Sequence, residues 1–197
     1  MSNKLNITGH LEIYKQYKDG TTELVFDDPN VITKGMGIGL SFLFTASGSN
    51  SILDYRIDRF QLGVSGASSL QVSSTQTLSG ALSSYEEYGT ETDLVLATNN
   101  LIASGGDLSG QIFALVPKYH IAKIGKSSVR YTLVVDEDTC NNITRNSQTV
   151  YPNEVGLFMK NPTGSANDRS ILVAYRYFGE IQKTEEFSLI FRWTINF

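Results

Sequence analysis

Few residues in this chain have the chemistry and spacing of an active site. The two histidines, His10 and His120, lie in separate predicted strands, and the only cysteine is Cys140. Neither an H-E-x-x-H nor a C-x-x-C pattern is present, so the usual zinc ligands are not spaced to share one ion. Because a histidine alone in a strand is typical of a surface or hydrogen-bonded residue, we expect no imidazole catalysis.

Carboxylates are the candidate calcium ligands. Asp136, Glu137 and Asp138 form one acidic run, and Asp27 and Asp28 form another. Neither run has the ordered ligand spacing of a calcium loop, and carboxylates at strand ends are usually solvated turn residues. The pattern therefore favours turns over a metal site.

Carboxylates are also the residues of glycoside hydrolysis, and Glu86, Glu87 and Glu154 are the candidates here. That reaction needs two carboxyl groups at a defined separation across a cleft. Positions along the chain do not define such a separation. We expect no enzyme, and hence no catalytic residues.

The glycines Gly35, Gly37 and Gly39 resemble part of a dinucleotide-binding loop. The full pattern is G-x-G-x-x-G between a strand and a helix of a βαβ unit. Here the third glycine comes one residue early, and no alternation of strands and helices follows. We interpret the segment as a tight strand-to-helix turn with close backbone packing, and we expect no bound cofactor.

Tyrosine is abundant, with ten residues in the chain. Tyrosine rings are favoured in protein interfaces and also line sugar-binding sites, because a rigid apolar ring carries one polar group. Tyr85, Tyr88 and Tyr151 are the candidate contacts with a partner protein or a glycan. About half of the ten tyrosines are expected to form cross-strand pairs that stabilise sheets.

Composition narrows the class of protein. Of 197 residues, 18% are charged and the net charge is −4, with the basic residues scattered along the chain. Binding along a phosphate backbone needs clustered Lys and Arg, so nucleic acid is not an expected partner. The first residues lack the apolar segment of a signal peptide, and no apolar stretch is long enough to cross a bilayer. We therefore expect a protein made in the cytoplasm, without a membrane partner.

The positions of these residues depend on the predicted elements. Residues 5–30 predict a β-hairpin that turns at Asp19 and Gly20, with Leu24 and Phe26 facing inward on the second strand. The run from Asp27 to Asn30 is expected to end that strand, because it contains Pro29. A short helix is predicted next, with Thr33 as its N-cap and Gly48 at its end.

Six further strands are predicted by alternating apolar residues after a strand at residues 54–66. They cover residues 92–98, 110–124, 127–137, 153–160, 169–178 and 186–197. Many strands with one helix predict a mainly β fold, an antiparallel β-sandwich that is jelly-roll-like. Residues 1–197 are expected to form a single domain, with a Ser/Thr-rich loop or arm at 65–84.

The last predicted strand has the clearest pattern. Apolar residues recur at every second position, which is typical of a strand with one buried face. We expect four of them to close the core, namely Phe191, Trp193, Ile195 and Phe197.

The C-terminal third contains a series of short motifs. Their residues are Glu154, Gly156, Leu157 and Phe158; Ala174, Arg176 and Phe178; Ile181 and Lys183; and Phe191, Trp193, Ile195 and Phe197. In this order the motifs resemble the ending of tailed-bacteriophage virion structural proteins. The segment "NVITKGMGIGL" and the strand "RFQLGVSG" are similar to earlier parts of such proteins. The resemblance implies a virion component without enzymatic residues, of the neck, tail or fibre-attachment, or capsid-decoration type.

Two hypotheses follow. The first is a non-enzymatic structural protein of a phage particle, located in the virion, that contacts other virion proteins and forms a symmetric homo-oligomer. The second is a lectin-like module that binds host-surface glycans through tyrosines and the 65–84 segment. Both use a β-sandwich, so the sequence leaves the choice open.

Overall fold

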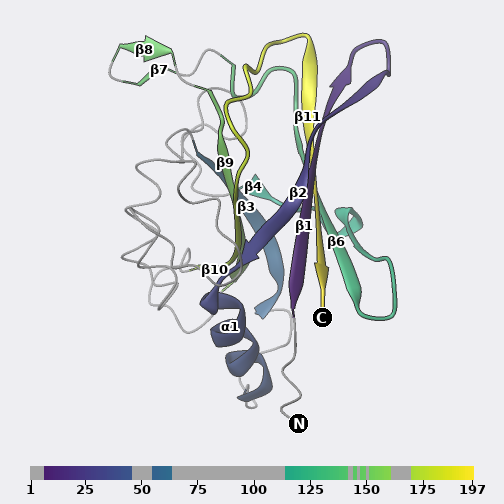
Figure 1. Cartoon of the computed structure of the whole chain (residues 1–197), viewed down its shortest axis with the longest axis vertical. Coiled ribbons are helices and arrows are strands. Elements are labelled where there is room, and N and C mark those ends of the chain that lie inside the picture. Colours follow the sequence, from purple (N-terminus) through teal and green to yellow (C-terminus); the bar gives the residue numbers. More distant parts are fainter. Residues whose placement is uncertain are drawn as a thin grey trace.

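The computed structural model describes residues 7–45, 55–63, 114–141, 144–145, 147–149, 151–160 and 170–197. The strands are β1 (Thr8–Tyr17), β2 (Thr22–Ile32), β3 (Ile57–Gly63), β4 (Ala114–Leu115), β5 (Ile121–Lys123), β6 (Ser128–Val135), β7 (Thr144–Arg145), β8 (Gln148–Thr149), β9 (Glu154–Lys160), β10 (Ser170–Tyr177) and β11 (Phe187–Asn196). Within these ranges the one α-helix is α1 (Lys34–Thr45), and η6 (Lys118–His120) is a 3₁₀ turn. The predicted mainly β class with one short helix is confirmed (Figure 1).

Nine of the strands form one antiparallel sheet in the order β4-β3-β9-β10-β2-β1-β11-β6-β5, and β7 pairs with β8. The two edge strands, β4 and β5, are joined by only the short segment that contains η6. The sheet therefore curls until its edges approach each other, which makes it barrel-like. The jelly-roll sandwich that the sequence predicted is not confirmed.

Strand β2 joins the two halves of this sheet. It pairs with β1 from Thr22 to Asn30 and with β10 at Val31 and Ile32. The prediction that the strand ends at Pro29 is wrong. Strand β10 is paired with β2 only beyond this proline, so Pro29 lies where β2 has one described neighbour and a missing N–H is tolerated.

The first hairpin turns where the sequence predicted. Gly20 adopts a φ of +86°, and the Thr21 N–H donates to the Asp19 carboxylate at 2.8 Å. The register of β1 and β2 then shifts next to Ile13 and Tyr14. Because a bulge changes which side chains face inward, Leu24 is 47% exposed, and its predicted inward orientation is wrong.

Residues 110–124 do not form the single strand that was predicted. Within the described part of this segment, β4 ends at Leu115, η6 follows directly after Pro117, and β5 begins at Ile121. Proline at the start of the 3₁₀ turn cannot donate a hydrogen bond to a neighbouring strand, so the ladder is interrupted there.

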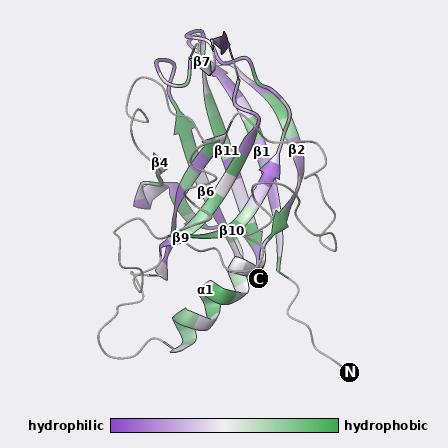
Figure 2. Cartoon of the chain, turned by 90° about the vertical axis from the view of Figure 1, so that its left-hand side faces the viewer, coloured by the Kyte–Doolittle hydropathy of each residue, from purple (hydrophilic) through white to green (hydrophobic). Residues whose placement is uncertain are grey.

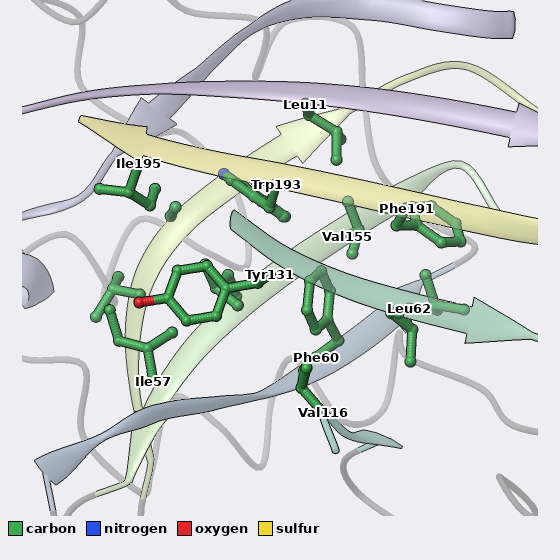
Figure 3. Close-up of a cluster of buried hydrophobic side chains, with 14 of the residues drawn as sticks. Leu11, Ile57, Phe60, Leu62, Val116, Tyr131, Val155, Phe191, Trp193 and Ile195 are labelled. Atoms are coloured by element: carbon green, nitrogen blue, oxygen red, sulfur yellow. The ribbon is translucent and has the colours of Figure 1, made fainter. Parts of the chain in front are cut away.

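Strand β11 lies between β1 and β6 and carries much of the core. Its register places Trp193 opposite Leu11 of β1 and Tyr131 of β6. The Trp193 ring lies 5.8 Å from the Phe60 ring of β3, which belongs to the other half of the sheet (Figure 3). This contact joins the two halves across the interior.

The four residues expected to close the core differ in their surroundings. Phe191, Trp193 and Ile195 are fully buried, whereas Phe197 is 36% exposed. Phe197 differs from the expected pattern because β11 ends at Asn196. Its backbone N–H donates to the Ser127 carbonyl at 2.9 Å, so it remains attached to the chain preceding β6.

Helix α1 lies at one end of the barrel and is largely hydrophobic (Figure 2). Thr33 precedes it, but the Thr33 hydroxyl donates to the Leu172 carbonyl, and the Thr33 N–H donates to Val173 O at 3.1 Å. The predicted N-cap role for this side chain is therefore wrong. Thr33 instead continues the contact between β2 and β10.

Two glycines allow α1 to approach the sheet closely. A Cβ atom at Gly35 would overlap the Leu172 carbonyl oxygen, and one at Gly39 would overlap the Met159 sulfur. A Cβ at Gly37 would meet no atom within 4 Å. The interpretation of close backbone packing is confirmed for Gly35, whereas Gly39, four residues later on the same helix face, lies against the end of the Met159 side chain.

We predict opposite effects of alanine at two of these glycines. Gly35→Ala should lower the free energy of unfolding by about 1–3 kcal/mol, because the backbone of β10 must move. Gly37→Ala should raise it by about 1 kcal/mol, because alanine favours the exposed helix interior. Urea denaturation measures both. Equal effects of the two substitutions would contradict the packing described above.

A second comparison tests the core face of β11. Ile195→Ala removes a fully buried side chain and should cost about 2–5 kcal/mol. Thr194→Ala, on the opposite face of the same strand, should cost less than about 1 kcal/mol. Thermal and urea denaturation would show the difference, and similar costs would argue against the observed register.

Candidate functional site

An apolar groove opens at the end of the barrel where α1 lies. Its volume is about 660 Å³, which is within the range of ligand- and partner-binding pockets. We call this end, with α1, the groove and the residues around it, the basal end. The lining residues are Met36, Leu40, Leu43, Tyr55, Arg56, Ile57, Asp58, Leu115, Val116, Pro117, Lys118, Ile121, Tyr131, Met159 and Phe197.

The groove is a consequence of how the barrel closes. Helix α1 covers one side of the basal end, where Met36 enters the core. The edge strands β4 and β5 are only two and three residues long, so they leave the other side open. Side chains from both edges, among them Leu115 and Ile121, line the remaining space.

Exposed apolar side chains line this groove or lie on the segments that contribute its lining residues. Among the described residues, the exposed large apolar side chains are Leu24, Phe44, Leu115, Tyr119, Ile124 and Phe197. All except Leu24 belong to α1, β4, η6, the chain just after β5, or the end of β11. Phe44 and Tyr119 are 82% and 81% exposed. We call these five residues the apolar rim.

Polar groups in the groove are few and mostly basic. Asp58 is a buried carboxylate at the bulge of β3, and it accepts hydrogen bonds from Arg56 Nε at 2.6 Å and Arg59 Nε at 2.9 Å. Arg56 is half exposed, so its charge reaches the groove mouth. Lys118 is exposed on the same wall. The charge of the groove lining is therefore positive, since it contains one carboxylate, Asp58, and two cations, Arg56 and Lys118.

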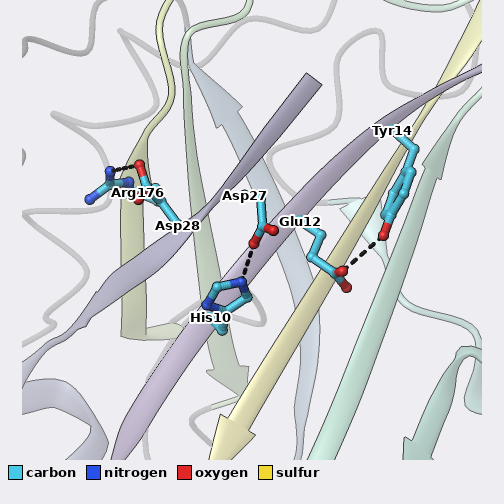
Figure 4. Close-up of polar contacts among 6 residues, drawn as sticks. All are labelled: His10, Glu12, Tyr14, Asp27, Asp28 and Arg176. Atoms are coloured by element: carbon cyan, nitrogen blue, oxygen red, sulfur yellow. Dashed lines mark hydrogen bonds and ion pairs between the residues drawn. The ribbon is translucent and has the colours of Figure 1, made fainter. Parts of the chain in front are cut away.

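The histidines do not form a catalytic group with each other. His10 lies on β1 and is paired with Asp27 of β2 (Figure 4). His120 lies in η6, and its ring contacts the Tyr119 ring at 4.5 Å. No group of three potential metal ligands occurs among the described residues.

The described carboxylates considered as calcium ligands or catalytic groups lie in different strands and turns of the structure. Asp28 is bonded to Arg176 at 2.8 Å, so both Asp27 and Asp28 pair with cationic or basic groups (Figure 4). Asp136 follows the end of β6, and Asp138 lies in the turn beyond it. Glu154 is buried in β9 and accepts a hydrogen bond from the Tyr175 hydroxyl at 2.7 Å. Glu86 and Glu87 lie outside the described residues.

Of the candidate tyrosine contacts, only Tyr151 is described. It is half-buried and precedes β9. Tyr85, Tyr88 and the 65–84 segment lie outside the described residues, as does the strand predicted at 92–98. The relative positions of the three tyrosines therefore stay a prediction.

Lys183 is one of the residues of the family resemblance. It makes hydrogen bonds at the end of the barrel that lies opposite the basal end. Its buried ammonium donates to Glu137 O at 3.0 Å, Asn141 Oδ1 at 3.1 Å and Thr184 O at 2.8 Å. Burial lowers the pKa of Lys183 and raises that of the neighbouring Cys140 thiol to about 11. These contacts attach the loop after β6 to the segment before β11.

The sequence patterns did not indicate which residues line the groove. Arg56, Asp58 and Arg59 interrupt an apolar strand pattern, and such charges inside a strand were the available signal. Phe44, Leu115 and Lys118 gave none, because they belong to α1, β4 and η6, separate elements whose residues make contacts around one groove only in the folded chain. Periodicity within one segment cannot show such contacts.

Tyr131 provides a test of the groove's low polarity. Burial raises its pKa from 10.0 to about 12. Between pH 10 and 12 the unfolded chain therefore loses a proton that the folded chain keeps. The free energy of unfolding should fall by up to about 1.4 kcal/mol per pH unit from this group.

We predict that Tyr131→Phe reduces this alkaline loss, because phenylalanine has no proton to release. Denaturation of both proteins between pH 8 and about 12 measures the effect. Below pH 9 the difference between the two free energies of unfolding should not depend on pH. An unchanged alkaline slope would show that Tyr131 ionises normally in the folded protein.

None of the described helices has the length and apolar character needed to cross a bilayer. In comparisons with protein-family models, with curated proteins and with solved structures, no match to this chain was found.

Proposed function

We propose that this protein is a non-enzymatic structural component of a bacteriophage particle that acts by protein–protein assembly. The candidate places are the neck, the tail or fibre attachment, and the capsid surface as a decoration protein. Its partners are other virion proteins and further copies of itself in a symmetric homo-oligomer. The virion is accordingly its proposed location, after synthesis in the host cytoplasm.

The observation that carries this proposal is the apolar rim around the groove. Exposed apolar side chains grouped at one place mark interaction sites, whereas single scattered ones are ordinary. Two of them, Leu115 and Phe197, line the open groove, and the other three lie within three residues along the chain of a lining residue. A partner that covers this end would remove that surface from water.

The resemblance to virion proteins supports the same proposal. Its residues lie in or beside β9, β10 and β11, and most are buried, including Leu157, Ala174 and Trp193. They form the scaffold rather than a site. The jelly-roll connectivity stays part of this proposal, because residues 64–113, which join β3 to β4, lie outside the described residues.

Binding of host glycans stays a prediction from the sequence. Two of its three candidate contacts, Tyr85 and Tyr88, lie outside the described residues. Tyr151 is half-buried and is not among the residues that line the groove. No specific contact favours this function over assembly.

The proposal predicts that mass spectrometry of purified particles detects this chain in a fixed ratio to the major capsid protein. Its consistent absence from infectious particles would contradict the proposed function. Detection in infected cells alone would not support it.

A variant tests whether the apolar rim is the assembly surface. Phe44→Ser combined with Leu115→Ser should fold normally, because both side chains are exposed, and should be depleted from particles by tenfold or more, on the order of a 1–2 kcal/mol loss. Gln16→Ser, an exposed change on β1, is the control and should leave incorporation unchanged. Full incorporation of the double variant would place the assembly surface elsewhere.

A further inference from the structure

The two ends of the barrel carry opposite charge. Strand β11 pairs with both β1 and β6, so the residue pairs at its two ends show which residues lie at the same end of the barrel. Ser128 pairs with Asn196 at the basal end, and Val135 pairs with Leu189 toward the other end. We call this other end the apical end; it contains the β1–β2 turn, the residues after β6 and the residues before β11 (Figure 1).

The basal end is basic. Lys118, Lys123 and Lys126 are exposed and form no ion pair with described residues, and Arg56 lies at the groove mouth. Asp58 is the acidic side chain among the described groove residues, and it is buried between two arginines. The basal surface therefore presents unneutralised positive charge around an apolar centre.

Carboxylates outnumber cationic side chains at the apical end, although Lys18 of the β1–β2 turn is exposed there as well. Asp136, Asp138, Glu185 and Glu186 are exposed and form no ion pair with described residues. The buried Lys183 ammonium at this end is directed to carbonyl and amide oxygens. The apical half of β2 also carries Leu24, the exposed large apolar side chain that lies away from the groove.

We propose that copies of this chain associate head to tail, with the acidic apical end of one copy covering the basic, apolar-rimmed basal end of the next. Opposite charges of the two copies then meet around the groove. Leu24 at the apical end of one copy can pack against the apolar groove of the next. Such a contact joins two different surfaces, so it generates a closed ring or an open stack of copies.

The distribution of charge also argues against a symmetric two-fold dimer. A two-fold dimer through the basal ends would place Lys118, Lys123 and Lys126 of both copies against each other. Like charges brought together in an interface are strongly unfavourable, whereas complementary ends steer association and fix its direction. The inference rests on the proposed assembly function, and it names the partner as a second copy.

Charge reversal at each end tests this arrangement. One variant carries Lys118→Glu, Lys123→Glu and Lys126→Glu, and the other carries Asp138→Lys, Glu185→Lys and Glu186→Lys. All six side chains are exposed, so both variants should fold. Urea denaturation followed by the fluorescence of Trp193, the only tryptophan, verifies this. Sedimentation velocity then measures association.

The unmodified chain should form oligomers at about 0.01 M salt and dissociate near 1 M, where charges are screened within about 3 Å. Each variant alone should associate at least about tenfold more weakly. An equimolar mixture should recover oligomers larger than a dimer, because each variant then meets an opposite charge at both ends.

Three results would overturn the inference: an unmodified chain that stays monomeric at low salt, variants that associate like the unmodified chain, or a mixture that stops at dimers. The last result would indicate contact between like ends. Detection in particles is a separate measurement, so a monomeric chain that is nevertheless found in virions would overturn head-to-tail association and leave the proposed function intact.

Discussion

The packing of β11 across the interior is the contact on which the structure depends. This strand is hydrogen-bonded to β1 on one side and β6 on the other, and Trp193 extends from it to Phe60 on β3. A curled sheet is stable only when side chains from its opposite sides fill the space between them. The indole N–H of Trp193 has no hydrogen-bond partner among the described residues, and its surroundings are apolar side chains such as Leu11 and Phe60.

The barrel is closed differently at its two ends. At the apical end, Lys183 attaches the loop after β6 to the segment before β11 through three hydrogen bonds. At the basal end, α1 approaches the sheet at Gly35 and Gly39, but the short edge strands leave a groove beside it. Polar contacts thus complete one end, whereas the other exposes an apolar surface.

This difference connects the fold to the proposed function. The apolar rim and the basic side chains lie at the incomplete end, and the unpaired carboxylates lie at the completed one. A protein with these two ends has complementary surfaces without needing a catalytic site. Assembly from repeated copies is the function that we propose for such an arrangement.

Much of the scaffold followed from local patterns. Alternation predicted β1, β6, β9, β10 and β11, and Asp19 with Gly20 predicted the first turn, because period and turn chemistry are properties of neighbouring residues. Tertiary contacts decided the rest. Strand β2 passes Pro29, where only one neighbouring strand is described. A bulge exposes Leu24, and Thr33 bonds to β10 instead of capping α1.

The groove and the separation of charge also belong to the tertiary structure. The sequence by itself showed scattered basic residues and a small net charge. Antiparallel register brings Lys118, Lys123 and Lys126 to one end and Asp136, Asp138 and Glu186 to the other, because alternate strands run in opposite directions. The sequence alone thus determined the buried faces of strands such as β11, and the register of distant strands decided which charged and apolar side chains lie at the same end of the barrel.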